Sequence, residues 1–437
     1  MTRMIQCGVS ELNITPPLGS SIPGYFEDRT STGIKDELFA KSLIIESAGK
    51  TLAILAIDCI DLDSDIVKRI RDRVYAYTGI PPSCVMVSAT HTHTGPPVQA
   101  GFVDSYDASY ISFMVQKAAD AAILAFNSRR EARIGFGSGQ EGSIAFNRRY
   151  FMKDGRFATN PGVLNPLIDR AAGPIDPEVA VIRIDDMAGN PIGIVTNYAC
   201  HTDAVGGTEY SADYPGKLAA VLKQLLGINT ASLFLMGASG NINHIDVSGQ
   251  FPIVPNHYLT MGTILAGEVM KVREAVIPSG QAITLAAKQV FFSVAHRKPS
   301  QPDIQAAQEL LKAGTETRIE QIFAQLALEV DASEETCSEV ELQLLRIGEL
   351  AVVGLPGELF VEFGLEIKRK SPFKYTIVNE LCNGSATGYV STREAYEQGG
   401  YEPRITKRSK LAVEAGEQFV QQAMKALHEL RGIRHST

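Results

Sequence analysis

Apolar segments with the composition of buried β-strands alternate with segments of helical periodicity along the whole chain, and this alternation constrains the fold most strongly. Strand-like runs such as Leu52–Ile57 and Ser232–Met236 are apolar on both faces, which is typical of central strands. Helical periodicity is clearest in segments such as Ala108–Asn127 and Leu411–Leu430. No repeat, low-complexity tract or long linker divides the 437 residues. The pattern predicts one continuous α/β unit.

Two segments depart from this alternation. Between residues 300 and 336 two short helices joined at Gly314, with charged outer faces, interrupt two strands. We interpret them as a helical insertion that forms either a lid or an ordinary solvated helical pair. The stretch from Tyr150 to Asp176 contains Gly and Pro without clear periodicity, and long loops of this kind often border binding sites.

The charge balance excludes several classes of partner. The chain has 41 Lys and Arg against 49 Asp and Glu, a net charge of −8, which argues against binding to nucleic acid or to anionic lipid. No apolar run reaches the roughly 18 residues of a transmembrane helix, and the N-terminus lacks the apolar core of a signal peptide. The six cysteines show no C-x-x-C spacing, so we expect reduced and mostly buried thiols. We therefore expect a cytoplasmic protein without stable membrane insertion.

Unusual polar residues follow directly after several of the most apolar strands. Open α/β sheets bind ligands at these carboxyl ends of their strands. The polar clusters lie in residues 89–96, 200–203, 237–244, 355–358 and 383–389. The sequence therefore predicts a binding site where these strand ends meet.

Histidines in these clusters indicate metal chemistry. In an extended segment the spacing of His91 and His93 would project both imidazoles to the same side, which suits a metal or one ligand beside an acid/base group. With His201 and Glu358, the set matches a catalytic zinc site. Glu358 has an alternative interpretation as an acid that complements the dipole of the helix expected just after it.

The glycine-rich loop at 237–244 has competing interpretations. A nucleophile elbow requires Gly-x-Ser-x-Gly, and Asn241 stands at its final glycine position. A phosphate-binding loop would require a Gly-Lys-Ser/Thr ending, which is absent. We interpret the loop as a turn that lets backbone amides, Asn241, Asn243 and His244 approach a substrate closely.

Taken in order, these clusters resemble the catalytic domain of the neutral/alkaline non-lysosomal ceramidase family. The resemblance begins at Asn13–Gly19, is most specific at Ser88–Pro96, and continues through Gly388-Tyr389-Val390. It implies an α/β fold of mixed β-sheets flanked by helices, forming a single large catalytic domain over residues 1–437.

The resemblance also implies a ligand set and several roles. One zinc ion would be held by two His, one Glu and one Tyr, which fall on His91, His201, Glu358 and Tyr389. His93 would be an acid/base group, Arg148 would contact the region of the substrate carbonyl, and Tyr401 would be a further active-site tyrosine.

The chain departs from the family in three ways. By the resemblance, Asn243 takes the position of the family's catalytic serine, and we expect neither the family's C-terminal immunoglobulin-like domain nor a secretion signal. A zinc-activated water needs no serine, because the metal lowers the pKa of its water to about 7. We therefore expect a zinc-dependent amide hydrolase acting on an N-acyl small molecule other than ceramide, with Arg148, Tyr401 and Asn243 orienting the carbonyl or stabilising the oxyanion.

Three alternatives remain open. The same residues suit a zinc-dependent esterase or lactonase, and loss of the serine suits a non-catalytic ligand-binding homologue. A site with two metals for phosphoester hydrolysis would add His244, Asp58 and Asp213 to the histidines. Asp213 also has two simpler interpretations, as a residue that orients a metal ligand or as the cap of the following helix.

Overall fold

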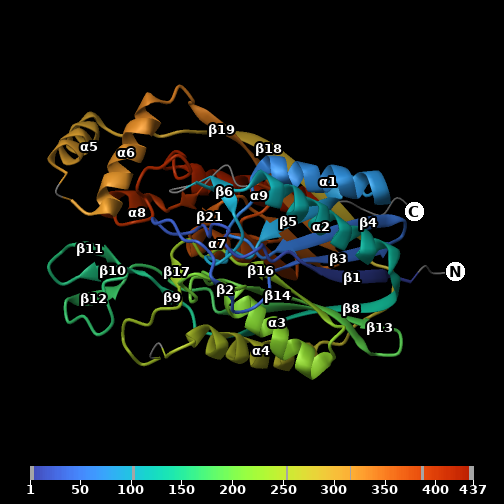
Figure 1. Cartoon of the computed structure of the whole chain (residues 1–437). Helices are drawn as coiled ribbons and strands as arrows, with labels where there is room; N and C mark the ends of the chain where they lie inside the picture. Colours follow the sequence, from blue (N-terminus) through green and yellow to red (C-terminus); the bar gives the residue numbers. More distant parts are fainter. Residues whose placement is uncertain (1–3, 101–103, 252–253, 315, 385–387, 433–437) are drawn as a thin grey trace.

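A mixed sheet of eight strands forms the centre of the protein, in a computed structural model that describes residues 4–100, 104–251, 254–314, 316–384 and 388–432 (Figure 1). The strand order is β16-β14-β13-β8-β1-β3-β4-β5. The outermost pairs β4–β5 and β14–β16 are parallel, and the pairs between them are antiparallel. The strands are β1 (Gln6–Asn13), β3 (Phe39–Ser47), β4 (Lys50–Ile57), β5 (Val85–Ala89), β8 (Arg130–Gln140), β13 (Glu178–Asp186), β14 (Pro191–Tyr198) and β16 (Ala231–Met236).

Two pairs of helices cover this sheet. Helices α1 (Ser64–Thr78) and α2 (Ala108–Asn127) pack together, with α2 on β1 and β3, and α3 (Asp213–Leu226) packs with α4 (His257–Ala275) against β8, β13 and β16. Helix α2 begins at Asp107, whose carboxylate accepts the backbone N–H groups of Ser109 and Tyr110. Its buried residues recur at the spacing of one helical face, which explains why its sequence folds as a helix on an apolar sheet.

A second sheet packs on the first through a shared core. It consists of β18 (Leu285–Ala295), β19 (Cys337–Ile347), β20 (Leu350–Gly354) and β22 (Tyr375–Asn379), with β20 and β22 parallel. Leu345, Val352 and Ile377 of this sheet belong to the same buried cluster as the strands of the larger sheet. Helices α7 (Val361–Lys370) and α9 (Ala415–Gly432) cover the smaller sheet. This arrangement confirms the predicted single α/β domain of mixed sheets flanked by helices.

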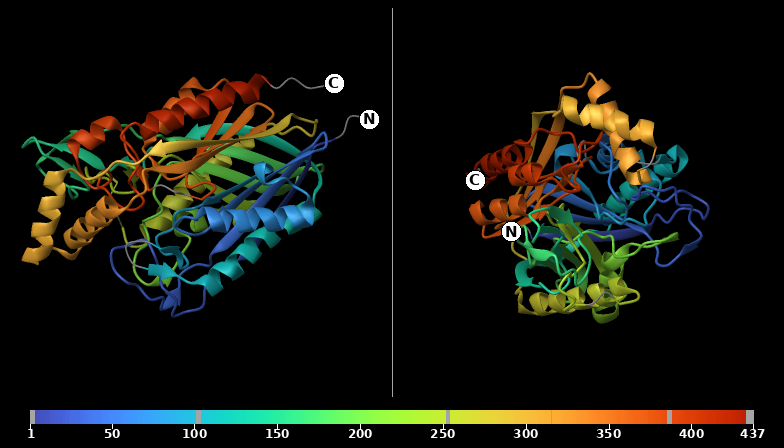
Figure 2. Two further views of the ribbon diagram at one scale, coloured as in Figure 1. Left: turned by 90° about the horizontal axis from the view of Figure 1, so that it is seen from above. Right: turned by 90° about the vertical axis from the view of Figure 1, so that its left-hand side faces the viewer.

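Two substructures lie at the end of the protein opposite the chain termini (Figures 1 and 2). One is the hairpin of α5 (Gln301–Ala313) and α6 (Arg318–Ala332), which begins at a capping box on Ser300. The other is a three-stranded sheet of β10 (Arg149–Met152), β11 (Phe157–Thr159) and β12 (Ile168–Ala171). The prediction of irregular structure from 150 to 176 was therefore wrong, because strands this short carry no detectable periodicity.

Short elements complete the chain. They are β2 (Gly33–Ile34), η1 (Pro82–Cys84), β6 (Val98–Ala100), β7 (Asp104–Tyr106), β9 (Phe146–Asn147), β15 (Glu209–Tyr210), β17 (Ile242–Asn243), β21 (Glu358–Leu359), β23 (Tyr389–Val390) and α8 (Arg393–Gln398). Within the described ranges, no helix is both long and apolar enough to cross a membrane. All six cysteines are free thiols, and of these Cys337 is exposed.

Candidate metal centre

His91 reaches the site through a sharp backbone turn. It follows β5 and adopts the left-handed conformation, with φ of 68°, while its N–H donates to the Cys59 carbonyl at 2.9 Å. The expectation that residues 91–93 are extended was therefore wrong, because the left-handed conformation of His91 interrupts the extended backbone directly after the strand. The imidazoles of His91 and His93 nevertheless meet, with ring centroids 4.9 Å apart.

Carbonyl oxygens orient the two imidazoles of the predicted ligands. Nδ1 of His91 lies 2.8 Å from the Ile60 oxygen, and Nδ1 of His201, just after β14, lies 2.9 Å from the Ser239 oxygen. A carbonyl only accepts hydrogen bonds, so each Nδ1 carries a proton and each Nε2 is left free to bind a metal.

Glu358 and Tyr389 are brought together by a short parallel bridge. They are paired residues of β21 and β23, and the Glu358 N–H donates to the Gly388 oxygen at 2.9 Å. Helix α7 begins at Val361, after Phe360 at its N-cap, with Glu362 as the acid of its first turn. Glu358 therefore lies outside the helix, and its alternative interpretation as a helix-dipole acid is not supported.

Side-chain atoms of these four residues converge at distances that suit a zinc ion. Oε2 of Glu358 lies 3.4 Å from Nε2 of His91 and 3.3 Å from Nε2 of His201, and the Tyr389 hydroxyl lies 3.4 Å from the same His201 nitrogen. Ligands at the usual zinc distances of about 2.0–2.1 Å lie about 3.3–3.4 Å apart when tetrahedral. Nε2 of His91 and Oε2 of Glu358 are buried without a hydrogen bond, which is costly unless a cation binds between them. The residues therefore fit a zinc ion.

His93 lies at the edge of the same cluster. Its Nδ1 is 3.1 Å from the Gly24 oxygen, and its Nε2 is buried without a hydrogen bond. The ligand nitrogens of His91, His93 and His201 all lie within 4.8 Å of one another. Burial, together with the neighbouring His91, lowers the pKa of His93 to about 3, so its imidazole is neutral.

Arg148 places a positive charge beside the two predicted site tyrosines. Its guanidinium lies 5.3 Å from the ring centroid of Tyr389 and 5.9 Å from that of Tyr401, and these two rings contact each other at 5.7 Å. Burial and Glu358 raise the pKa of the Tyr389 phenol, whereas Arg148 opposes that rise. Arg148 therefore favours the ionised phenol that a metal would bind.

The predicted substrate contacts from the glycine-rich loop have other partners. The amide of Asn241 accepts the Val361 N–H and donates to Glu362, both at 2.9 Å. The amide of Asn243 donates to Asn160 at 2.9 Å, and Nδ1 of His244 lies 3.1 Å from Asp203. Their polar atoms thus hold the loop to neighbouring elements, and their roles as substrate contacts stay predictions.

The acids of the proposed site for two metals are also engaged elsewhere. Asp213 accepts the N–H groups of Val205 and Tyr214 at the start of α3, and Asp58 accepts the N–H of Phe39 and the hydroxyl of Thr90. In the described part of the chain, the group with metal-binding spacing contains three histidines and neither of these acids. The geometry therefore favours a single metal.

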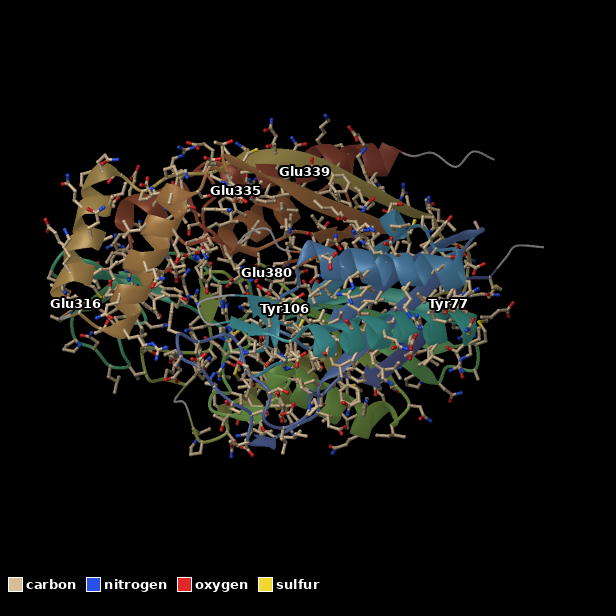
Figure 3. The ribbon with its side chains drawn as sticks, turned by 45° about the horizontal axis from the view of Figure 1, so that its top comes forward. Tyr77, Tyr106, Glu316, Glu335, Glu339 and Glu380 are labelled. Atoms are coloured by element: carbon tan, nitrogen blue, oxygen red, sulfur yellow. The ribbon has the colours of Figure 1, made fainter. Side chains whose placement is uncertain are left out.

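Two buried acids that the sequence analysis missed support the site. Glu380 accepts the Ser239 hydroxyl at 2.6 Å and the Leu359 N–H at 2.9 Å, so it joins the segments beside His201 and Glu358; Figure 3 labels it near the centre of the protein. Burial raises the pKa of Glu380 to about 8. A lone acid after the apolar run Tyr375–Asn379 was the available signal.

The second missed acid is Glu402. Its two oxygens accept Nε of Arg148 at 2.8 Å and Nη1 of Arg149 at 2.6 Å. Although burial alone would raise the pKa of Glu402, the two guanidinium groups hold it below its usual value. Glu402 thereby fixes Arg148 against the rings of the site.

Comparisons with known proteins agree with this architecture. Two curated relatives from Dictyostelium discoideum, neutral ceramidase A and neutral ceramidase B, are 25% and 29% identical over 224 and 177 residues. These matches cover 47% and 38% of this chain and only 29% and 23% of the relatives, so the chain spans less than a third of either.

Solved structures show the same fold. A neutral ceramidase from Pseudomonas aeruginosa superposes with a TM-score of 0.77 at 19% identity, covering 99% of this chain and 76% of that one. A ceramidase complexed with C2 superposes with a TM-score of 0.76 at 18% identity, covering 99% and 77%. The model of the neutral/alkaline non-lysosomal ceramidase family, N-terminal region, matches residues 5–231, more than half of the chain. The chain therefore belongs to the neutral/alkaline non-lysosomal ceramidase family.

Proposed function

We propose that the protein is a zinc-dependent hydrolase that cleaves the amide bond of an N-acyl compound. The observation that carries this proposal is the convergence of Glu358 on His91 and His201 at 3.3–3.4 Å, with buried atoms that lack hydrogen bonds. Tyr389 completes a set of four ligands. A bound zinc would polarise the substrate carbonyl and lower the pKa of an attacking water.

The proton transfers are assigned to His93. Its neutral imidazole is held by Gly24 through Nδ1, so Nε2 can accept a proton from the attacking water and return it to the leaving nitrogen. We assign to Arg148 and Tyr401, which lie side by side, the role of stabilising negative charge that develops on the carbonyl oxygen.

A serine nucleophile has no support at this site. We expect Asn243 at the family's serine position, and the hydroxyl of Ser239 in the same loop donates to Glu380 at 2.6 Å. The proposal therefore relies on water as the nucleophile. Esters and lactones present the same carbonyl to the same residues, and a panel of substrates separates these activities from amide cleavage.

We propose a substrate smaller than ceramide. The cavity at the metal site, lined by His91, His93, Glu358, Tyr389 and Tyr401 among others, has a volume of about 60 Å³. Pockets that enclose drug-sized ligands have volumes of about 300–1,000 Å³. A short N-acyl amine or N-acyl amino acid matches the smaller volume better than a lipid with two long chains.

The experiment is hydrolysis of a panel of ceramides, short N-acyl amines, N-acyl amino acids, esters and lactones by purified zinc-loaded protein. We expect turnover of a short N-acyl compound, abolished in His201→Ala and unchanged in His428→Ala, which alters an exposed histidine on α9. Hydrolysis that survives in His201→Ala would contradict the proposal. Ligand-induced thermal stabilisation without product would instead indicate a binding protein.

A further inference from the structure

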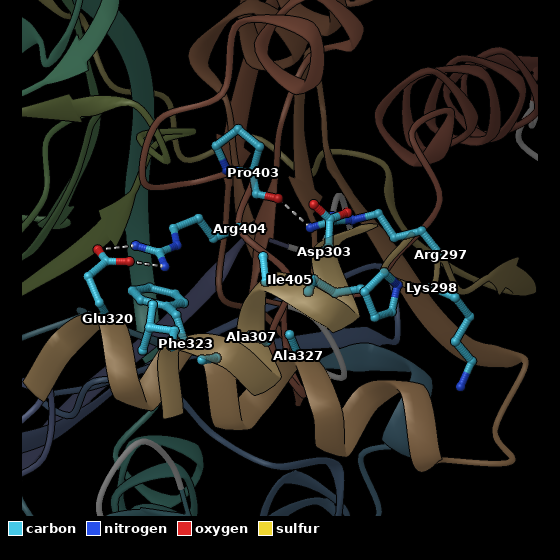
Figure 4. Close-up of a pocket in the computed structure, with 14 residues that line it drawn as sticks. Arg297, Lys298, Asp303, Ala307, Glu320, Phe323, Ala327, Pro403, Arg404 and Ile405 are labelled. Carbon is cyan, nitrogen blue, oxygen red and sulfur yellow. Dashed lines mark hydrogen bonds and ion pairs between the residues drawn. The ribbon is translucent and has the colours of Figure 1, made fainter. Parts of the chain in front are cut away.

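Two neighbouring cavities beneath the α5–α6 hairpin share Phe323 as a lining residue. The metal-site cavity of about 60 Å³ and an outer cavity of about 370 Å³ are both lined by Phe323 and Arg404. Figure 4 shows the outer cavity with these two residues. On the hairpin side, the outer cavity presents an apolar surface of Ala307, Leu310, Phe323, Ala324 and Ala327. Phe323, with Arg404 against its face, therefore stands between the metal site and a larger cavity that is apolar on its hairpin side and charged on the other, where Arg297 and Lys298 line it.

Phe323 packs against the side chains of three neighbours, Phe26, Tyr401 and Arg404. Its ring centroid lies 5.4 Å from that of Phe26 and 5.9 Å from that of Tyr401, in an edge-on arrangement for Tyr401. The guanidinium of Arg404 covers its face at 3.7 Å and binds Glu320 of the same helix through two hydrogen bonds of 2.7 Å. Only 4% of Phe323 is exposed, so these contacts bury the ring almost completely.

The loop that carries Tyr401 also holds the hairpin. Besides Arg404, Lys407 pairs with Glu329 at 2.9 Å and Lys410 pairs with Glu335 at 2.6 Å. These pairs lie at the surface, where each is worth about 0–1 kcal/mol. The hairpin is therefore anchored over the metal site mainly by the buried packing of Phe323 and its neighbours.

We propose that Phe323 sets the length of the acyl chain that the enzyme accepts, by closing the metal-site cavity against the outer cavity and its apolar hairpin side. This inference rests on the proposed amide hydrolase function. In the native protein, a short acyl group fits beneath the ring at the metal. Removal of the ring would join the two cavities and give a longer alkyl chain an apolar path beneath α5 and α6.

The test measures kcat/KM for amides of one amine with acetyl, octanoyl and hexadecanoyl chains. We expect the native enzyme to prefer the acetyl amide, and Phe323→Ala to raise the ratio of octanoyl to acetyl kcat/KM by at least about tenfold. Phe323→Leu, which keeps more of the apolar packing, should give a smaller rise in the same direction. Ile319→Ala, one turn earlier on α6 at an exposed residue that lines neither cavity, should leave the ratio unchanged.

Each outcome bears on a distinct claim. Native enzyme that cleaves all three chain lengths equally, or Phe323 variants that keep the native ratio while both remain folded by thermal denaturation, would overturn the role of Phe323 and leave the hydrolase proposal standing. Native zinc-loaded protein that cleaves no amide, ester or lactone would overturn the proposed function and this inference with it.

Discussion

The buried ion pairs of Glu402 give the sharpest prediction about what holds the site together. Its side chain is 0% exposed, and its partners Arg148 and Arg149 are 5% and 2% exposed. In Glu402→Gln, a neutral amide faces two buried guanidinium groups. Breaking a buried ion pair on one side costs about 3–5 kcal/mol, so we expect the free energy of unfolding to fall by about 3 kcal/mol.

The matched control is Glu320→Gln, which also neutralises a carboxylate that binds an arginine through hydrogen bonds of 2.7 Å. Glu320 and Arg404 are 40% and 31% exposed, so the same substitution should cost only about 0–1 kcal/mol there. Urea denaturation of both variants beside the native protein measures the difference. A loss below about 1 kcal/mol in Glu402→Gln, or equal losses in the two variants, would refute the argument.

Three further predictions follow from the site and its surroundings. Burial raises the pKa of Asp213 to about 7. The folded state therefore binds the carboxyl proton of Asp213 more tightly than the unfolded state does, so the free energy of unfolding falls as pH rises from the unfolded pKa toward 7. In urea denaturation, the free energy of unfolding of Asp213→Asn relative to that of the native protein should rise by about 3 kcal/mol between pH 5 and pH 8. The same difference at both pH values would contradict this prediction. Removal of metal by a chelator should lower the Tm, and zinc should restore it where magnesium does not; an unchanged Tm would count against the site. Glu380→Ala leaves Ser239 and the Leu359 N–H without their acceptor, so zinc affinity measured by competition should fall about 10–100-fold, and native affinity would refute its positioning role.

Much of the architecture could be predicted from local sequence patterns. Buried strands such as Leu350–Gly354 and amphipathic helices such as α2 carry their signal within one element. Strand β8 was missed because Gly135, Gly137 and Gly139 interrupt its apolar pattern. A Cβ at Gly137 would lie 2.5 Å from Val276, the residue that follows α4, so these glycines let the C-terminal end of α4 approach the sheet closely.

In the candidate site, too, some residues could be predicted from local sequence, whereas others depend on contacts between distant parts of the chain. His91, His201 and Glu358 follow apolar strands directly, and that local feature marked them before their geometry was known. The partners of Glu402 and Glu380 could not be found by this route, because Glu402 meets Arg148 across 254 residues of sequence. Nothing near either acid in the sequence indicates which distant group satisfies it. Likewise, the backbone N–H and the imidazole of His91 are held by the Cys59 and Ile60 carbonyls, which only the folded chain brings to them.

Metal content tests the central claim most directly. We expect protein purified without chelators or a metal-affinity tag to contain zinc at one ion per chain by elemental analysis. His201→Ala and Glu358→Gln should lose this zinc, whereas His428→Ala should keep it. Native protein without stoichiometric metal, or with two ions per chain, would contradict the metal centre proposed for His91, His201, Glu358 and Tyr389.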